Sequence, residues 1–482
     1  MLSVVTGVAF TLLLTRNMTK EEYGVWSNIF DLVGYFLIFG GLFPFWATRF
    51  VARGKEGAVK TGLLANLIFA LVSIAVYIPL IPIITGRFNI SGKYVIMYVV
   101  ASAQVVNLYL ISMLESCIRA EKPQALGYGL LIEEVCKISL AYLLIVGFQQ
   151  LFLGAMLSLI FGVSFQIVYY IKLEWKGLRA RFQWDYVREW LKGSIANLYN
   201  SVGTQIAAFA LILLFLYGGQ AARGDYQAAI TFANIVGYSS FLAFALYPRL
   251  LAKDSLEDIA SSLKTVLMFA IPMAAVAIAM SQSLLTVLNV SYSNASPVLF
   301  FLVIDALVLL LSQFYTSVLF GVENLDEKAK IPLNKLVRSK IFKAFTLPYI
   351  QAAIALPATY YVLTRSTVGT SVQAATYVAI INLATHVLTF LALYVITRKS
   401  VRIVVPWRNV AKYIFASAIA ATMLYVLPHP TTLTSTFAFV AAGGATCGAL
   451  ILAMDKDART LAGLIWREIE SKFPKSAHQQ HV

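Results

Sequence analysis

Seven ionisable side chains lie inside long apolar stretches of this 482-residue chain: Asp31, Glu115, Glu133, Glu134, Lys137, Asp305 and His386. A charge in such a setting is costly, so it must have a partner or a use. A carboxylate there can bind and release H⁺ or Na⁺, whereas a cation can hold an anionic group such as a phosphate. These residue types therefore point to ion and anion binding rather than to covalent chemistry.

Lys137 is the basic residue that lies deepest within an apolar stretch, near its middle. We expect it to contact an anionic ligand, since a phosphate group drawn into an apolar region needs a cation. An alternative is that Glu133 and Lys137, four residues apart, pair along one helix face. That pair would be neutral and structural.

Three carboxylates are candidates for cation coupling. Asp31 and Asp305 lie about two helical turns from one end of their apolar stretches. Glu134 is preferred over Glu133 as a proton carrier because Ile138, and not a basic residue, follows it four positions later. The alternative for each is a hydrogen bond to a neighbouring helix, and His386 is expected to be a packed polar residue.

Arg49, Arg53 and Arg249 lie where two apolar stretches end in basic loops. Arg49 and Arg249 occupy matched positions of an internal repeat described below, so they can face one shared entrance and bind a diphosphate there. The alternative is that they only anchor their helices at the membrane surface, as basic residues commonly do.

No sequence motif for an enzyme is present. The chain lacks HExxH, a phosphate-binding GxxxxGK[ST] loop and a CxxC pair, and its three cysteines lie in or beside apolar stretches. We therefore expect a protein that is not an enzyme and carries no cofactor. Without a nucleotide site, the energy for any transport has to come from gradients, with H⁺ or Na⁺ as possible coupling ions.

The elements that position these residues follow from composition. The chain is 59% hydrophobic and 13% charged, so it cannot cover its surface with polar groups and requires lipid as its solvent. The apolar stretches are about 20 residues long without strand-like alternation, which predicts membrane-spanning helices. We expect an all-α polytopic membrane protein with about 14 spans, at 1–15, 23–46, 61–84, 94–117, 125–147, 151–171, 194–217, 227–248, 265–285, 297–319, 344–363, 372–397, 411–427 and 434–454.

The net charge of +15 reflects the position of basic residues in loops on one side of the membrane, and it does not indicate nucleic-acid binding. With the N-terminus inside, the inside loops and tail hold 31 lysines and arginines and the outside loops hold 6. This asymmetry predicts a multi-pass protein of the cell membrane with both termini in the cytoplasm.

The second span recurs in the eighth. Tyr23 precedes Gly34-Tyr35 at the same offsets at which Tyr226 precedes Gly237-Tyr238. We interpret this as two parallel six-helix bundles around a central cavity, residues 1–193 and 194–397. Residues 398–454 add two further spans, and residues 455–482 form a cytoplasmic tail that is amphipathic between Arg459 and Phe473.

Several stretches resemble the Wzx-like polysaccharide and oligosaccharide flippases of the multidrug/oligosaccharidyl-lipid/polysaccharide (MOP) exporter superfamily. Residues 15–26 (TRNMTKEEYGVW) resemble the segment after the first span of that family. Residues 224–229 (GDYQAA) are similar to the opening of its second half, and residues 243–250 (AFALYPRL) to the exit from span 8. Two turns, 119–123 (RAEKP) and 321–324 (GVEN), are similar to its turns after spans 4 and 10, although Asn324 replaces the usual lysine.

The resemblance implies two bundles that move a polyprenyl-pyrophosphate oligosaccharide across the membrane by alternating access, for polysaccharide or glycoprotein assembly. Its partners would be this lipid-linked sugar and membrane lipids, with glycan-assembly enzymes nearby; we expect a monomer and no nucleic acid. The alternative is a cation-coupled exporter of drugs or metabolites with the same fold. A membrane-embedded glycosyltransferase is disfavoured because the outside loops are short.

Overall fold

The computed structural model describes residues 2–239, 256–322, 339–365, 369–401 and 403–472. Within these ranges every regular element is a helix and no strand occurs. This confirms the prediction of an all-α protein. Arg249 lies outside the described residues.

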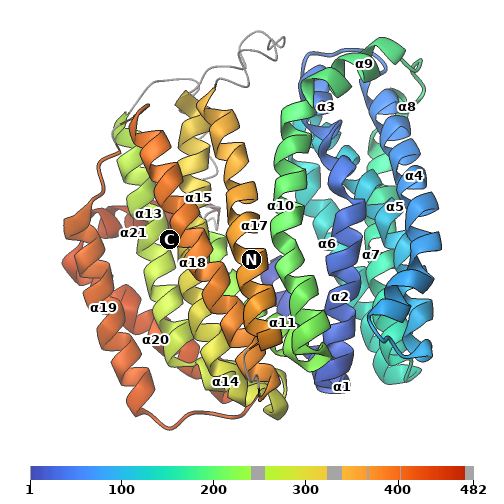
Figure 1. The fold of residues 1–482 in the computed structure, drawn as a ribbon. Helices are drawn as coiled ribbons and strands as arrows, with labels where there is room; N and C mark the ends of the chain where they lie inside the picture. The colour runs from blue at the N-terminus through green and yellow to red at the C-terminus, as the bar shows by residue number, and fades with distance from the viewer. Residues whose placement is uncertain (1, 240–255, 323–338, 366–368, 402, 473–482) are drawn as a thin grey trace, which may run out of the picture.

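The first half of the chain forms one group of helices (Figure 1). Its elements are α1 (Leu2–Asn17), α2 (Lys20–Phe36), η1 (Ile38–Gly41), α3 (Pro44–Ala52), α4 (Ala58–Arg87), α5 (Gly92–Glu121), α6 (Gln124–Ala141), η2 (Tyr142–Gly147) and α7 (Leu151–Leu173). In this group α4 packs against α5, α5 against α7, and α6 against both α7 and α1. The short helices α8 (Trp175–Leu178) and α9 (Trp184–Gly193) then lead to the second half.

The second half of the chain contains a further set of long helices. Its elements are α10 (Ile195–Leu213), η3 (Leu214–Gly218), α11 (Gln220–Gly237), α13 (Leu256–Ala279), α14 (Ser281–Leu288), η5 (Val290–Ala295), α15 (Ser296–Val322), α17 (Lys340–Arg365) and α18 (Ser371–Arg398). The remaining described elements are α19 (Trp407–Val426), α20 (Leu433–Met454) and α21 (Lys456–Lys472).

Ten helices in the described ranges are long and apolar enough to cross a membrane, and the bent pair α2 and η1–α3, broken by 53°, makes eleven. Three predicted spans fall on other elements. Span 1–15 coincides with α1, span 125–147 with α6 and η2, and span 227–248 begins in α11 and continues beyond the described residues. The structure therefore agrees with a polytopic membrane protein.

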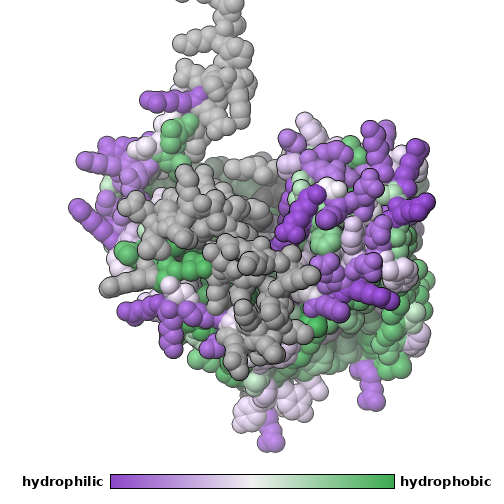
Figure 2. Space-filling model, turned by 90° about the horizontal axis from the view of Figure 1, so that it is seen from above, coloured by the Kyte–Doolittle hydropathy of each residue, from purple (hydrophilic) through white to green (hydrophobic). Residues whose placement is uncertain are grey.

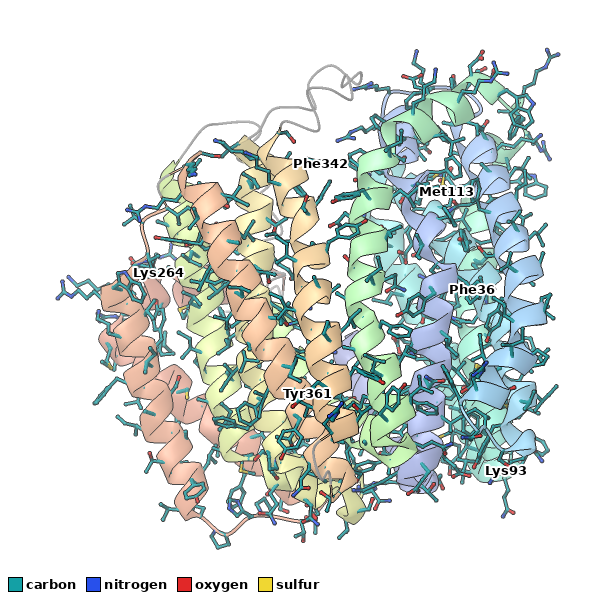
Figure 3. All side chains as sticks on the ribbon, viewed as in Figure 1. Phe36, Lys93, Met113, Lys264, Phe342 and Tyr361 are labelled. Atoms are coloured by element: carbon teal, nitrogen blue, oxygen red, sulfur yellow. The ribbon has the colours of Figure 1, made fainter. Side chains whose placement is uncertain are left out.

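The long helices run between two ends of the molecule, which we name the α9 end and the α14 end after the short helices found there (Figure 1). Lys93 and Tyr361 lie toward the α14 end and Phe342 toward the α9 end (Figure 3). Viewed from above the α9 end, hydrophilic side chains gather over the first half (Figure 2). The sides of the helices carry exposed large apolar residues such as Ile83 and Val168, as expected where lipid is the solvent.

Local sequence determines where α2 begins. Thr19 is its N-cap and accepts a hydrogen bond from the Glu22 backbone N–H, while the Glu22 side chain accepts one from the Thr19 N–H. This reciprocal capping satisfies two backbone donors that the helix itself cannot pair. The cap places Lys20 in the first turn and Asp31 on the same helix, about 16 Å further along.

Candidate functional site

The two halves meet most extensively where α2 crosses α11. Arg223 on α11 donates two hydrogen bonds to Asp31 on α2, from Nε to Oδ2 at 2.7 Å and from Nη2 to Oδ1 at 2.8 Å. Lys20 on α2 lies 2.6 Å from the Asp225 carboxylate on α11. Two ion pairs therefore connect the halves. In one pair the cation is on α11 and the anion on α2, and in the other pair the cation is on α2 and the anion on α11.

These charges are shielded from solvent within the protein. The side chains of Arg223 and Asp31 are 4% and 13% exposed, and those of Lys20 and Asp225 are 18% and 0% exposed. Gln227 accepts a further bond from Arg223 Nη1 at 3.0 Å, and Ser371 donates to Asp225 at 2.8 Å. Each of the two ion pairs thus has an additional polar partner, which helps to make its burial tolerable.

A second polar group lies within the second half. His386 on α18 uses Nδ1 to contact Asp305 Oδ1 on α15 at 2.7 Å and Nε2 to contact Gln351 on α17 at 2.8 Å. One turn away on α18, Asn382 donates to the hydroxyl of Tyr226 on α11 at 3.1 Å. Asp305 is therefore paired with an imidazole that is held from its other side by α17.

Lys137 lies in a compact ion cluster on α6. Its Nζ is 2.7 Å from Glu134 and 3.8 Å from Glu133, and it also lies over the ring of Phe10 on α1 at 5.7 Å. The pair with Glu133, which the sequence offered as the alternative to an anionic ligand, is present, but the closer partner is Glu134, three residues before the lysine. Glu134 therefore has a basic partner at three-residue spacing, which brings side chains together on a helix as four-residue spacing does.

The arginines at the end of span 2 that was predicted to face the cytoplasm lie on or beside α3, near the α9 end. The Arg49 guanidinium lies 3.8 Å from the centre of the Phe45 ring and 5.5 Å from that of Trp46. Arg53 is exposed at the C-terminus of α3. The structure brings neither of them to Lys137 or to the Asp31–Arg223 pair, and their predicted counterpart Arg249 is outside the described ranges.

An apolar groove of about 510 Å³ lies between α1 of the first half, helices of the second half and the C-terminal helices. Its walls come from α1, α11, α13, α14, α20 and α21, with Phe232, Met273 and Val440 among the lining residues. Near the α9 end it is bordered by Ala458, Leu461 and Ala462 of α21. The predicted amphipathic segment is indeed helical, and part of its apolar face lines the groove.

Arg223 and Lys20 were missed as site residues. Both lie just outside the apolar stretches and were therefore assigned to outside loops. An apolar stretch marks the part of a helix that crosses the membrane but does not show where the helix begins. Each lies in the first turn of its helix and is paired with the opposite half, with Arg223 buried and Lys20 partly buried. The available signal was the presence of Asp31 in an apolar stretch, since a buried carboxylate requires a cation that its own helix does not supply.

No family model and no curated protein matches the sequence, but solved structures do. A structure of the lipid II flippase MurJ in an inward closed conformation has a TM-score of 0.63 and 13% identity, over 95% of this chain and 97% of that chain. An inward-facing multidrug resistance MATE family transporter of the MOP superfamily has a TM-score of 0.60 and 12% identity, over 83% and 96%. A MOP superfamily transporter from Pyrococcus furiosus has a TM-score of 0.51 and 13% identity, over 83% and 94%.

At these identities the likeness concerns the fold. It extends over nearly the whole of each solved chain, so it describes the complete arrangement of helices and not one shared bundle. The chain has the fold of the MATE and MurJ transporters of the MOP superfamily.

Proposed function

We propose that this protein moves an amphiphilic, anionic lipid-linked oligosaccharide across the membrane by alternating access between its two halves. The observation that carries the proposal is the groove along α13 and α20, which is lined by apolar side chains. A polyprenyl chain would be favourably buried along such an apolar surface.

The extent of the structural matches supports the same choice. The match to the lipid II flippase covers 95% of this chain, whereas the match to the MATE family transporter covers 83%. The flippase fold therefore accounts for more of this chain than the MATE fold does.

We assign the cargo's diphosphate to the predicted cations, Arg49 and Arg53 at the α9 end and Lys137 deeper in the membrane. The fourth predicted cation, Arg249, lies outside the described residues. Arginine suits this role because its planar guanidinium binds phosphate oxygens in pairs. The lysine and arginine asymmetry favours a cytoplasmic α9 end. Residues 1–193 and 194–397 are the moving halves of this scheme.

The coupling residues of this scheme are Asp31, Glu134 and Asp305. Asp305 is the best supported because it contacts His386, so that one proton can be shared or released between an acid and an imidazole. A cation-coupled exporter of drugs or metabolites is the second candidate, and it is favoured by the same Asp305–His386 pair and by the MATE fold.

The test is binding and flipping in lipid. Protein in nanodiscs should bind a polyprenyl-pyrophosphate sugar, and proteoliposomes should move a fluorescent form of it. Val440→Trp, which fills the groove, should weaken binding of the lipid-linked sugar at least about tenfold, equivalent to about 1.4 kcal/mol. The matched control is Val426→Trp at a position 78% exposed on α19.

Two outcomes would favour the exporter instead. One is equal binding of the lipid-linked sugar by both tryptophan variants. The other is cation-driven efflux of small organic cations that the Val440→Trp variant retains in full.

A further inference from the structure

We propose that Lys20, Asp31, Arg223 and Asp225 form a gate at the α14 end, held shut by crossed ion pairs that must separate before cargo can leave there. The inference rests on the proposed alternating access and deepens it by naming the residues that close one side. We call these four residues the α14 gate.

Neither helix can neutralise its own gate charges. On α2, Lys20 and Asp31 are eleven residues apart, about 16 Å along the axis, which is too far for a direct pair. On α11, Arg223 and Asp225 are two residues apart, and side chains at that spacing point to different faces of a helix. Both ion pairs therefore form between the halves and not along one helix.

The distribution of charge suits a contact that opens and closes. Each helix contributes one cation and one anion, so each half remains neutral at the gate when the pairs separate. In the closed state the ions are paired out of water, and in an open state water can hydrate all four. The four charged side chains thus have favourable partners in both the closed and the open conformation. A contact that switches between two conformations needs this property, because otherwise one conformation would leave charges unpaired.

The helices also touch at the backbone beside these pairs. A methyl group at Gly24 would overlap the Gln220 carbonyl oxygen, and one at Gly224 would overlap the Lys20 carbonyl oxygen. The two glycines thus permit a crossing so close that no path for cargo remains between α2 and α11 at this point.

A neighbouring contact closes the same end. Arg16 at the end of α1 donates to the Val287 carbonyl oxygen of α14 at 3.1 Å, and Asn289 donates to the Thr15 carbonyl oxygen at 3.1 Å. Both join the first half to the second. In this structure the α14 end is therefore closed by two ion pairs, by these hydrogen bonds, and by the close crossing of α2 and α11 at Gly24 and Gly224.

The experiment measures the gate itself and not transport. Spin labels at Lys93→Cys on the first half and Tyr361→Cys on the second half lie at exposed positions of the α14 end (Figure 3). They are introduced into a chain in which Cys117, Cys136 and Cys447 are replaced by alanine. Pulsed electron paramagnetic resonance in nanodiscs then gives the populations of the short and long distances between the halves.

Asp31→Asn and Asp225→Asn should each raise the ratio of long to short distances by at least about tenfold. The reciprocal exchanges, Asp31→Arg with Arg223→Asp and Lys20→Asp with Asp225→Lys, should return the ratio toward that of the parent chain. Glu174→Gln is the matched control, because it breaks the 3.5 Å Lys122–Glu174 pair within the first half and should leave the ratio unchanged.

An unchanged ratio in both neutralised variants would overturn the gate. So would an equal rise in Glu174→Gln, or exchanges that remain folded by size-exclusion chromatography without restoring the short distance. A gate that responds as expected in a protein that fails to bind lipid-linked sugar would instead refute the proposed cargo and leave the gate in place.

Discussion

Arg223 and Asp31, 192 positions apart in the sequence, form a bidentate ion pair between the two halves of the molecule. The fork of the guanidinium matches the two carboxylate oxygens, which confers geometric specificity as well as attraction. A pair of this kind requires a defined orientation of α2 against α11, so the pair reports on the relative position of the halves.

Arg223→Lys should loosen this contact less than Arg223→Gln does. Lysine retains the positive charge but offers a point charge in place of a two-pronged donor. Measured with the distance labels at Lys93 and Tyr361, the lysine variant should have an open-to-closed ratio between those of the parent and the glutamine variant. Equal ratios for the two substitutions would mean that geometry does not matter at this contact.

Gly24→Ala should push α2 away from α11. The added methyl group meets a backbone carbonyl group, which cannot rotate away as a flexible side chain can. We expect a destabilisation of the closed α14 end of about 1–3 kcal/mol, visible in the same distance distribution. Gly237→Ala on α11 is the control, because no heavy atom lies within 4 Å of the position that its added methyl group would occupy.

Lys137→Met should lower the free energy of unfolding by about 3 kcal/mol, because it leaves Glu133 and Glu134 without their cation. Adding Glu134→Gln should recover much of that loss. The double variant also separates the two roles of Lys137 when binding of a polyprenyl-pyrophosphate sugar is measured. Weak binding by a stable double variant indicates contact with the cargo, whereas normal binding indicates a structural lysine.

Asp305→Asn and His386→Gln should reduce gradient-driven transport about tenfold while changing cargo affinity less than about twofold. Each substitution removes one titratable member of the pair but retains a polar side chain of similar size. Transport with and without an imposed H⁺ or Na⁺ gradient provides the measurement. Gln313→Asn, at an exposed position on α15, is the control. Retained gradient dependence in both variants would exclude this pair from coupling.

Asp455 joins α13, α19, α20 and α21 near the α9 end. Burial raises the pKa of its carboxyl, but hydrogen bonds from Tyr413 and Asn409 outweigh that effect. The charges of Lys264 and Lys412 act in the same direction as these hydrogen bonds, so the net pKa lies below its ordinary value of 3.8. A carboxyl with a lowered pKa stabilises the folded state above the unfolded pKa, and this stabilisation disappears as the pH falls through the folded pKa.

Asp455→Asn should therefore unfold more easily than the parent chain at neutral pH. The difference should shrink as the pH falls below 3.8, because the parent then loses the same charge. Thermal unfolding in detergent, followed from neutral to acidic pH, measures this difference. Asp185→Asn, at an exposed site on α9, should show no comparable trend. A difference that stayed constant across the range would assign the effect of Asp455 to packing alone.

The sequence by itself determined the class of the protein. Long apolar stretches can be accommodated only as helices in lipid, because lipid offers no partner for backbone N–H and C=O groups. Local spacing also predicted the Glu133–Lys137 pair, since side chains four residues apart on a helix are neighbours whatever the rest of the fold does.

The tertiary structure decided which distant groups meet. Asp31 was recognisable as a buried carboxylate, but its cation lies in the first turn of α11, and Asp305 is paired with a histidine on α18 that was expected only to pack. The Asp31 pair depends on how the halves cross at Gly24 and Gly224, which is a property of three-dimensional packing. Periodicity within one helix carries no information about the angle at which another helix crosses it, and for that reason the polar contacts between the halves could be described only from the folded chain.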